Sequence, residues 1–317
     1  MKRLTLFPIA ALLFSALFTA CGQSNGADDV KTPEAKQQVA PFAPDAAWNA
    51  YWYSGKAELT SYNLIQNRYG ELHTGTAVNI FVTEDFSKSK QVKLDNPSSA
   101  GNDKLPVLKL NQSIKFVTGI YPYSLMLSTF QPVDLNNYPH AIKVSGSVQE
   151  WCGMAYFQLN ERNDAYQITS NSYFESEGDR TLQLATVMQE DAIWNMIRLK
   201  PESLPTGNIS ILPGALYLRL SHQPLEPVQA KATIVKEGNA VWYTVDMPSL
   251  KRILTIQYEN SFPYRILGWE DSYPGFDGKV LTTKATRNKE MITDYWRTHN
   301  NADRPLREQL GLPVDTQ

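Results

Sequence analysis

The chain has 317 residues, a formal net charge of −2 and 42% hydrophobic residues. Basic and acidic residues are interspersed along most of its length, which excludes the strongly basic surface that nucleic acid binding requires. The length is enough for one large domain or two smaller units.

The first twenty residues have the pattern of a bacterial lipoprotein signal peptide. Lys2 and Arg3 precede an apolar run from residue 4 to residue 18, and Cys21 follows a pair of small residues. The run is shorter than the ~20 residues of a membrane-spanning helix, which favours a cleaved signal. We predict a signal peptide over 1–20 and lipidation of Cys21 by chains such as palmitate, which anchors the protein to a membrane. The alternative is an ordinary signal peptide cut nearby.

The segment after the lipidated cysteine is predicted to be a flexible tether over 21–41. It is small and polar without an apolar period, and it buries too little surface to offset its chain entropy. Gly22 stands where an aspartate marks retention in the inner membrane, so the outer membrane is favoured, facing the periplasm or the surface. Residues 42–317 remain for a β-rich globular body.

Cysteine and histidine usage predicts neither a disulfide nor a metal site, and no cofactor motif is present. With Cys21 lipidated, Cys152 has no partner within the chain, which has two cysteines. The histidines occur singly, without the spacing that places two ligands together. They are His73, His140, His222 and His299.

Three helices are predicted in chain order. Asp45 caps the first, over 46–55, and the last runs over 304–310. The central one, over 188–200, has acidic residues near its start, basic residues near its end and an apolar stripe between them.

About a dozen strands are predicted from runs of β-branched and aromatic residues between turn signals. Their ranges are 56–66, 75–86, 90–95, 105–111, 113–130, 141–160, 166–175, 208–212, 215–221, 229–238, 240–247, 251–260, 264–272 and 278–287.

The order of these elements predicts a mainly β protein, with a curved antiparallel sheet or open barrel, a central helix and short terminal helices. Long helical crossovers, which parallel strands require, are missing. The two halves, about 56–187 and 206–290, are both rich in predicted strands, but their sequences show no residue-level repeat. A concave sheet must be covered, and the helix over 188–200 is the expected lid.

The stretch VQEWCGMAYFQLN, residues 148–160, contains a slip in the strand pattern. Val144 and Val148, before the slip, are at even-numbered positions, whereas the apolar residues after Gly153 are at odd-numbered positions. In an unbroken strand these two sets would lie on opposite faces. We predict a bulge or kink between Glu150 and Gly153. Cys152 is either a reactive thiol there or a buried small residue at a bend, and no base lies close to it in the sequence.

Aromatic residues are the other candidates for a binding site. Such side chains line apolar or sugar-binding cavities, although large sheets also use them for packing between strands. The candidate ligand-binding residues are Tyr121, Tyr123, Trp151, Trp242 and Trp269.

Several stretches resemble a known family: YGELHTGTAVNIFVTEDF, KQVKLDNP, IYPYSLMLSTF, SVQEWCG and LPTG. On the basis of these stretches, most of the body resembles a family of uncharacterised bacterial lipoproteins that carries the label septum formation inhibitor Maf. Maf pyrophosphatases have a Ser-Pro-Arg-Arg motif that this sequence lacks, so the resemblance brings no catalytic residues. In layout the chain is similar to periplasmic open-barrel proteins that carry lipids or lipoproteins.

Three functions are therefore weighed. The first is a non-enzymatic module for binding or envelope maintenance, with an apolar, lipid or glycan ligand. The second is an envelope enzyme, a hydrolase or thiol-dependent, centred on Cys152 or on a carboxylate such as Glu150 or Asp271. The third is a structural partner in an envelope complex. The sequence leaves the oligomeric state open.

Overall fold

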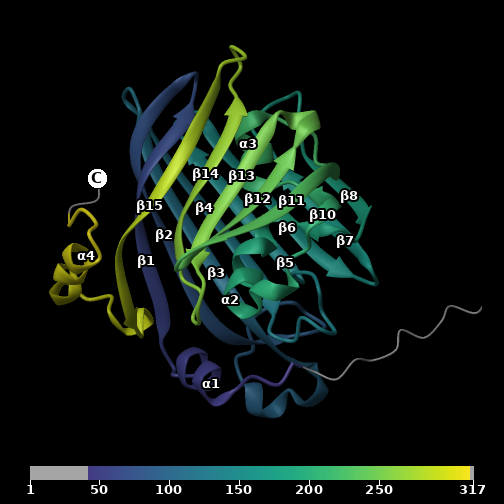
Figure 1. The fold of residues 1–317 in the computed structure, drawn as a ribbon, viewed down its shortest axis with the longest axis vertical. Coiled ribbons are helices and arrows are strands. Elements are labelled where there is room, and N and C mark those ends of the chain that lie inside the picture. Colours follow the sequence, from purple (N-terminus) through teal and green to yellow (C-terminus); the bar gives the residue numbers. More distant parts are fainter. Residues whose placement is uncertain (1–41, 315–317) are drawn as a thin grey trace, which may run out of the picture. The chain divides into compact units, whose positions relative to one another are not determined.

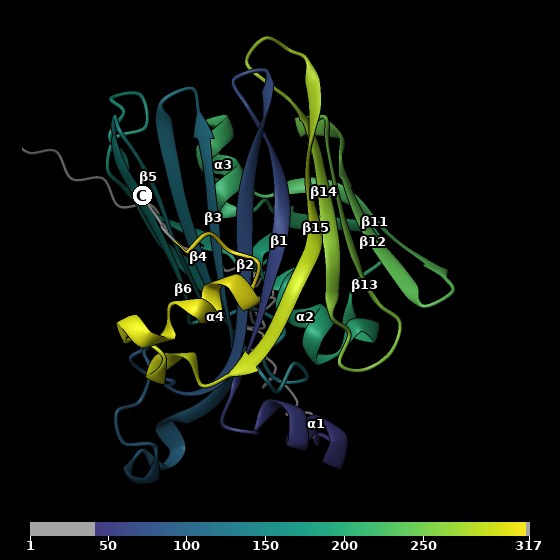
Figure 2. The same cartoon turned by 90° about the vertical axis from the view of Figure 1, so that its left-hand side faces the viewer.

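The computed structural model describes residues 42–314, and the predicted signal peptide, Cys21 and the tether lie outside them. Fifteen strands in this part of the chain form one curved, unclosed sheet (Figures 1 and 2). Strand β1 lies in the middle, β2 to β8 extend from one side of it, and β15 to β9 extend from the other. All neighbouring strands are antiparallel except the short pair β9 and β10. The predicted fold class is confirmed.

The bounds of the strands follow chain order. They are β1 (Ala57–Arg68), β2 (Glu71–Ser87), β3 (Lys104–Thr118), β4 (Tyr121–Pro132), β5 (Lys143–Glu150), β6 (Gly153–Arg162), β7 (Ala165–Asn171), β8 (Arg180–Ala185), β9 (Met188–Gln189), β10 (Gly207–Leu212), β11 (Val228–Glu237), β12 (Ala240–Met247), β13 (Arg252–Glu259), β14 (Ile266–Pro274) and β15 (Val280–Thr293). The helices are α1 (Ala46–Trp52), α2 (Ile193–Leu199), α3 (Ala215–Ser221) and α4 (Pro305–Gln309).

One face of the sheet is apolar because apolar and polar residues alternate along the strands. In β12, for example, Val241, Tyr243, Val245 and Met247 are buried and the residues between them are half-buried. That alternation is typical of an antiparallel sheet with its core on one side. Helix α4 packs against the other face, where Leu310 joins Leu59 and Val82.

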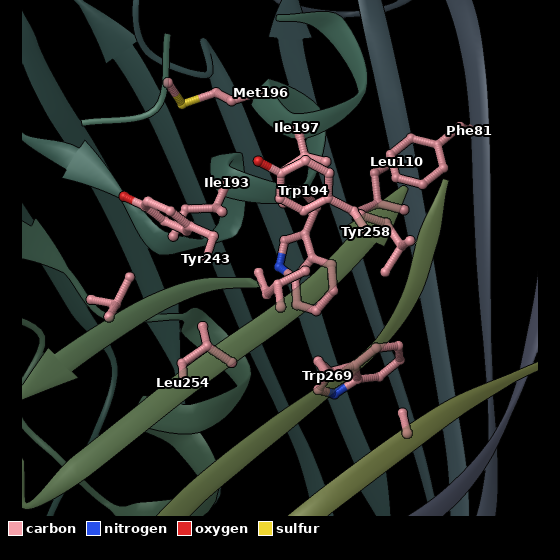
Figure 3. Close-up of a cluster of buried hydrophobic side chains, with 14 of the residues drawn as sticks. Phe81, Leu110, Ile193, Trp194, Met196, Ile197, Tyr243, Leu254, Tyr258 and Trp269 are labelled. Atoms are coloured by element: carbon pink, nitrogen blue, oxygen red, sulfur yellow. The ribbon is translucent and has the colours of Figure 1, made fainter. Parts of the chain in front are cut away.

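The central helix is shorter than predicted and is buried within the fold. Residues 188–192 form β9 and a turn of 3₁₀ helix, and α2 itself covers Ile193–Leu199. All seven residues of α2 are buried. Figure 3 shows Trp194 and Ile197 among side chains from strands on both sides of β1. The expectation that this helix covers the concave face is confirmed, and α2 does so as part of the core.

Other predicted elements also differ from the structure. Residues 90–95, predicted as a strand, make only an isolated bridge between Lys93 and Phe86. The strand predicted over 113–130 is divided by a turn at residues 119–120 into the end of β3 and most of β4. Residues 215–221, predicted as a strand, form α3, which packs on β4 and β5.

The expected bulge is a hairpin turn instead, in which Trp151 and Cys152 join β5 to β6 and Glu150 pairs with Gly153. Across a two-residue turn, even-numbered residues of one strand pair with odd-numbered residues of the next. The buried face therefore holds even-numbered residues in β5 and odd-numbered residues in β6, which explains the change in the apolar pattern after Gly153.

The two edge strands, β8 and β9, are directly connected. Only residues 186 and 187 separate the end of β8 from the start of β9. The hydroxyl of Tyr166, on β7, donates a hydrogen bond to the carbonyl of Val187. This link brings the two edges of the sheet close together at one end.

A buried ion pair fixes α2 inside the sheet. Arg198 contacts the Glu58 carboxylate through both terminal nitrogens, with Nη2 2.6 Å from Oε2, and its Nε donates to the carbonyl of Pro263 at 3.0 Å. The Tyr51 hydroxyl also contacts Glu58. Burial opposes ionisation of Glu58, but Arg198 outweighs it and holds the pKa of this carboxyl below its usual value.

Replacing Arg198 with methionine would leave the Glu58 carboxylate buried without its partner. We expect the free energy of unfolding, measured by urea denaturation, to fall by about 3–5 kcal/mol, as for other buried pairs that lose one member. Lys284→Met is the control, because it breaks an exposed pair with Glu270 and should cost at most about 1 kcal/mol. Equal losses in the two variants would contradict a structural role of the buried pair.

Candidate functional site

A cavity of about 630 Å³ lies between α3 and strands β5 to β8. This volume is within the range of about 300–1,000 Å³ that is usual for small-molecule sites. The apolar part of its wall comes from both the sheet and the helix. It includes Val148, Ala155, Phe157, Leu182, Leu216 and Leu218.

Small residues on the sheet leave the space that the cavity occupies. Gly146 pairs with Phe157, and Val148 pairs with Ala155. Gly146 and Ala155 both line the cavity. Glycine and alanine at these positions therefore keep the sheet from filling the space beneath α3.

Charged residues at one side of the cavity surround Glu177. Arg219 Nη1 donates to its carboxylate at 3.2 Å, and His222 Nδ1 contacts the same oxygen. The hydroxyl of Ser172 donates to the other oxygen. Burial opposes ionisation of Glu177, but these three partners hold the pKa of the carboxyl below its usual value.

Arg219 retains an unused donor at this site. Its guanidinium lies 4.8 Å from the ring centroid of Phe174. Its Nε is buried and has no hydrogen-bond partner among the described residues. Asp179 and Arg180 also line the cavity. The cavity therefore has an apolar wall and, at one side, a cluster of acidic and basic side chains.

Buried charges next to the cavity hold α3 in place. Arg252 is paired with two carboxylates, Glu190 at 2.6 and 2.8 Å and Asp271 at 2.7 and 2.9 Å. Asp191 accepts a hydrogen bond from the backbone nitrogen of Ala215 at 3.0 Å. Burial, assisted by the neighbouring Glu190, raises the pKa of Asp191 to about 7. Because Asp271 is enclosed with Arg252, its position does not resemble an open catalytic carboxylate.

The structure brings three of the predicted aromatic residues together. Tyr121 lies 5.7 Å from Tyr123 and 6.0 Å from Trp151 between ring centroids. Tyr123 and Trp151 also line a shallow groove of about 480 Å³ that is separate from the cavity beneath α3.

The other two aromatic candidates lie away from this group. Trp269 is buried in the core, with its ring 4.8 Å from that of Tyr62 and 5.1 Å from that of Trp194. Trp242 alternates with buried residues of β12 and so lies on the other face of the sheet.

Cys152 is exposed in the turn between β5 and β6, so the expectation of a buried small residue is wrong. The hydroxyl of Tyr121 donates to its sulfur, and its backbone nitrogen donates to Glu150 at 3.2 Å. The contacts with Cys152 and Glu150 raise the pKa of Tyr121. Neither contact is with the histidine or the cationic group that activates a catalytic thiol.

Sequence reasoning missed the residues that form the cavity. Leu216, Arg219 and Glu177 were not candidates because 215–221 was expected to be a strand and the strand predicted over 166–175 ends before Glu177. Within residues 42–314, no group of three or more His, Cys, Asp or Glu side chains is arranged to hold a metal ion. None of the helices described there is long and apolar enough to span a membrane.

Comparison with known proteins gives one distant structural similarity. No protein-family model and no curated protein matches the chain. It is similar to the crystal structure of a beta-barrel-like protein of domain of unknown function DUF1849 from Brucella abortus. The TM-score is 0.45 and the identity 10%, over 75% of this chain and 98% of that one. A similarity at this level bears on neither the function nor the site.

The raised pKa of Asp191 predicts a stability difference that depends on pH. The folded state keeps the proton up to about pH 7, whereas the unfolded carboxyl loses it near pH 3.9, so this contribution to stability falls between those values. Relative to Asp191→Asn, the wild type should lose about 1 kcal/mol or more of unfolding free energy between pH 5 and 8. Urea denaturation across this range measures the difference. Asp95→Asn, at an exposed position, should run parallel to the wild type, and parallel curves for Asp191→Asn would contradict the expectation.

Proposed function

We propose that the protein is a non-enzymatic lipid-binding module of the bacterial cell envelope, anchored to the outer membrane through Cys21. The ligand is an amphipathic lipid. Its apolar chain lies in the cavity beneath α3, and its polar head group lies beside Arg219 and Glu177.

The cavity beneath α3 is the observation on which this proposal rests. An apolar chain gains free energy from every part of its surface that leaves water, about 25 cal/mol per Å². The wall of leucine, valine, alanine and phenylalanine side chains provides that environment. The guanidinium of Arg219, which lines the cavity, is a cationic partner for an oxygen of the head group.

The same arrangement favours a lipid over a glycan. A sugar ring needs hydrogen-bonding groups around most of its edge, whereas the charged residues of this cavity gather around Glu177. The aromatic groove at Tyr123 and Trp151 is the alternative place for a glycan, but it is shallow and open.

The proposed location follows from the sequence pattern at Cys21 and from the resemblance to bacterial lipoproteins. An enzyme centred on Cys152, Glu150 or Asp271 has less support. Cys152 and Glu150 lie at an exposed turn, and Asp271 is already paired with Arg252.

Filling the cavity should weaken lipid binding. Leu182 lines the cavity from β8, and tryptophan at this position adds bulk where the apolar chain would lie. We expect Leu182→Trp to bind a fluorescent fatty acid at least ten-fold more weakly, as measured by titration. The matched control is Gln183→Trp, on the same strand but exposed on the other face, which should bind as the wild type does. Equal affinity for both variants would count against the cavity as the binding site.

Lipidation can be tested separately from ligand binding. Cys21→Ser removes the only acceptor in the proposed lipidation motif, so the protein should move from the membrane pellet to the soluble fraction of lysed cells. Metabolic labelling with an alkyne-bearing palmitate should mark the wild type and Cys152→Ser but not Cys21→Ser. Labelling of Cys21→Ser would contradict the predicted anchor.

A further inference from the structure

The exposed apolar side chains of the protein are concentrated at one end of the sheet. Among residues 42–314, ten large hydrophobic side chains are more than half exposed, and nine of these lie within two residues of five turns or loops. The tenth, Val235, lies on β11. The nine are Tyr69, Leu72, Val117, Ile120, Trp151, Met154, Tyr173, Phe276 and Val280.

These five connections lie at the same end because the strands are antiparallel. They are the turns at 69–70, 119–120 and 151–152, the loop at 172–179 and the turn at 275–279. Each of the first four joins an odd-numbered strand to the next even-numbered one, from β1 to β8. The fifth joins β14 to β15, which runs antiparallel to β1. We call this set the hairpin tips (top of Figure 1).

The opposite end of the sheet has a different composition. Its tight turns are Asn163–Asp164 and Gly238–Asn239, and its long connection between β2 and β3 contains the polar stretch NPSSAGND at 96–103. Helix α1 precedes the start of β1 and therefore also lies at this end (Figure 2). Among the described residues, large apolar side chains that are more than half exposed thus cluster at the hairpin tips and are missing from the turns at the opposite end.

We propose that the hairpin tips insert into the surface of a phospholipid bilayer. This inference rests on the proposed function, because it names the surface from which the lipid ligand enters the cavity. Tyrosine and tryptophan are enriched at membrane–water interfaces, where an apolar ring and a polar group are both satisfied. Tyr69, Trp151 and Tyr173 combine these properties at three of the four tips between β1 and β8.

The spacing of the tips favours a bilayer over a protein partner. Successive hairpins are two strand spacings apart, or about 10 Å, so the apolar side chains are separate points along a curved edge. A stable protein interface needs a continuous patch of about 800 Å² on each partner. A fluid membrane surface accepts separate side chains, each at its own depth.

The charged residues near the tips are balanced in sign, which favours a bilayer of lipids without net charge. Basic and acidic residues are balanced there, so no large net attraction to anionic lipid is expected. The basic residues are Arg68, Lys115, Arg180, Arg219, Lys251 and Lys279, and the acidic ones are Glu71, Glu150, Glu175, Glu177, Asp179, Glu226 and Asp277.

The length of chain before the body allows the tips to reach the membrane that holds the proposed anchor. Residues 22–41 span up to about 70 Å when extended. The longest strand, β2, has 17 residues and is about 55 Å long. A tether that joins the body at the end with α1 is therefore longer than the sheet, and the tips can turn toward the bilayer.

The tips also adjoin the lipid cavity. The loop at 172–179 contains Tyr173, one of the tip residues, and Glu177, which lines the cavity. The segment after α3 contributes Gln223, Pro224 and Leu225 to the same cavity. A lipid that leaves a bilayer at the tips thus meets the cavity without crossing a wide layer of water.

Vesicle binding by a chain shortened to residues 39–317 tests this inference, since these residues form one compact unit. Cys152 is then the only cysteine, and it is exposed at a tip. An environment-sensitive fluorophore attached to it should brighten and shift to the blue on addition of phosphatidylcholine–phosphatidylethanolamine vesicles. The unlabelled chain should sediment with the vesicles, and high salt should change this little.

Substitutions at the tips should abolish sedimentation and spare folding. We expect Ile120→Ser, Trp151→Ser and Phe276→Ser together to reduce vesicle partitioning at least ten-fold, with the thermal melting curve unchanged. The matched control is Tyr53→Ser, Val235→Ser and Trp296→Ser, which are about half exposed elsewhere and should leave partitioning intact.

Three outcomes would overturn the inference: no fluorophore shift with vesicles, equal sedimentation of the two triple variants, or a shift produced only by envelope proteins. The test is separate from that of the proposed function. Leu182→Trp should bind vesicles normally while losing the fatty acid, and the tip variant should bind the fatty acid normally in solution.

Discussion

Buried pairs of arginine and carboxylate fix the two helices that fill the concave face of the sheet. Arg198 ties α2 to Glu58 at the start of β1, and Arg252 ties Glu190, just before α2, to Asp271 on β14. Asp191 then accepts from the first backbone nitrogen of α3. A curved sheet that does not close has an apolar face to cover, and these contacts determine which segments cover it and where they stop.

The position of α3 follows from this arrangement and decides where the cavity lies. Its start is held by Asp191, and the carbonyl of Leu220 near its end accepts a hydrogen bond from Arg68 on β1. Fixed at both ends, α3 packs on β4 and β5, and the cavity lies between it and strands β5 to β8. The position of this space therefore depends on polar contacts made elsewhere as well as on the small residues of the sheet.

The sequence predicted local structure well where one period dominates. The alternation in β12 and the capping of α1 by Asp45, whose carboxylate accepts from Trp48 at 2.7 Å, could both be read from neighbouring residues. It failed at 215–221, where Leu216, Leu218 and Leu220 alternate as in a strand although the segment is helical. It also misread the turn at Cys152, because a bulge and a two-residue hairpin shift the pattern in the same way. The candidate site was largely unpredictable, since it depends on contacts such as Arg219 with Glu177, 42 residues apart in the chain.

The link between the two edge strands limits how the sheet can change shape. Residues 186 and 187 keep the Cα atoms of Ala185 and Met188 within about 11 Å of each other. From that point β8 and β9 leave as two free edges, so the gap between them is a wedge with its narrow end at the link. Any widening of the sheet would therefore have to be a rotation about these two residues, with the largest displacement at Arg180, where β8 begins beside the cavity.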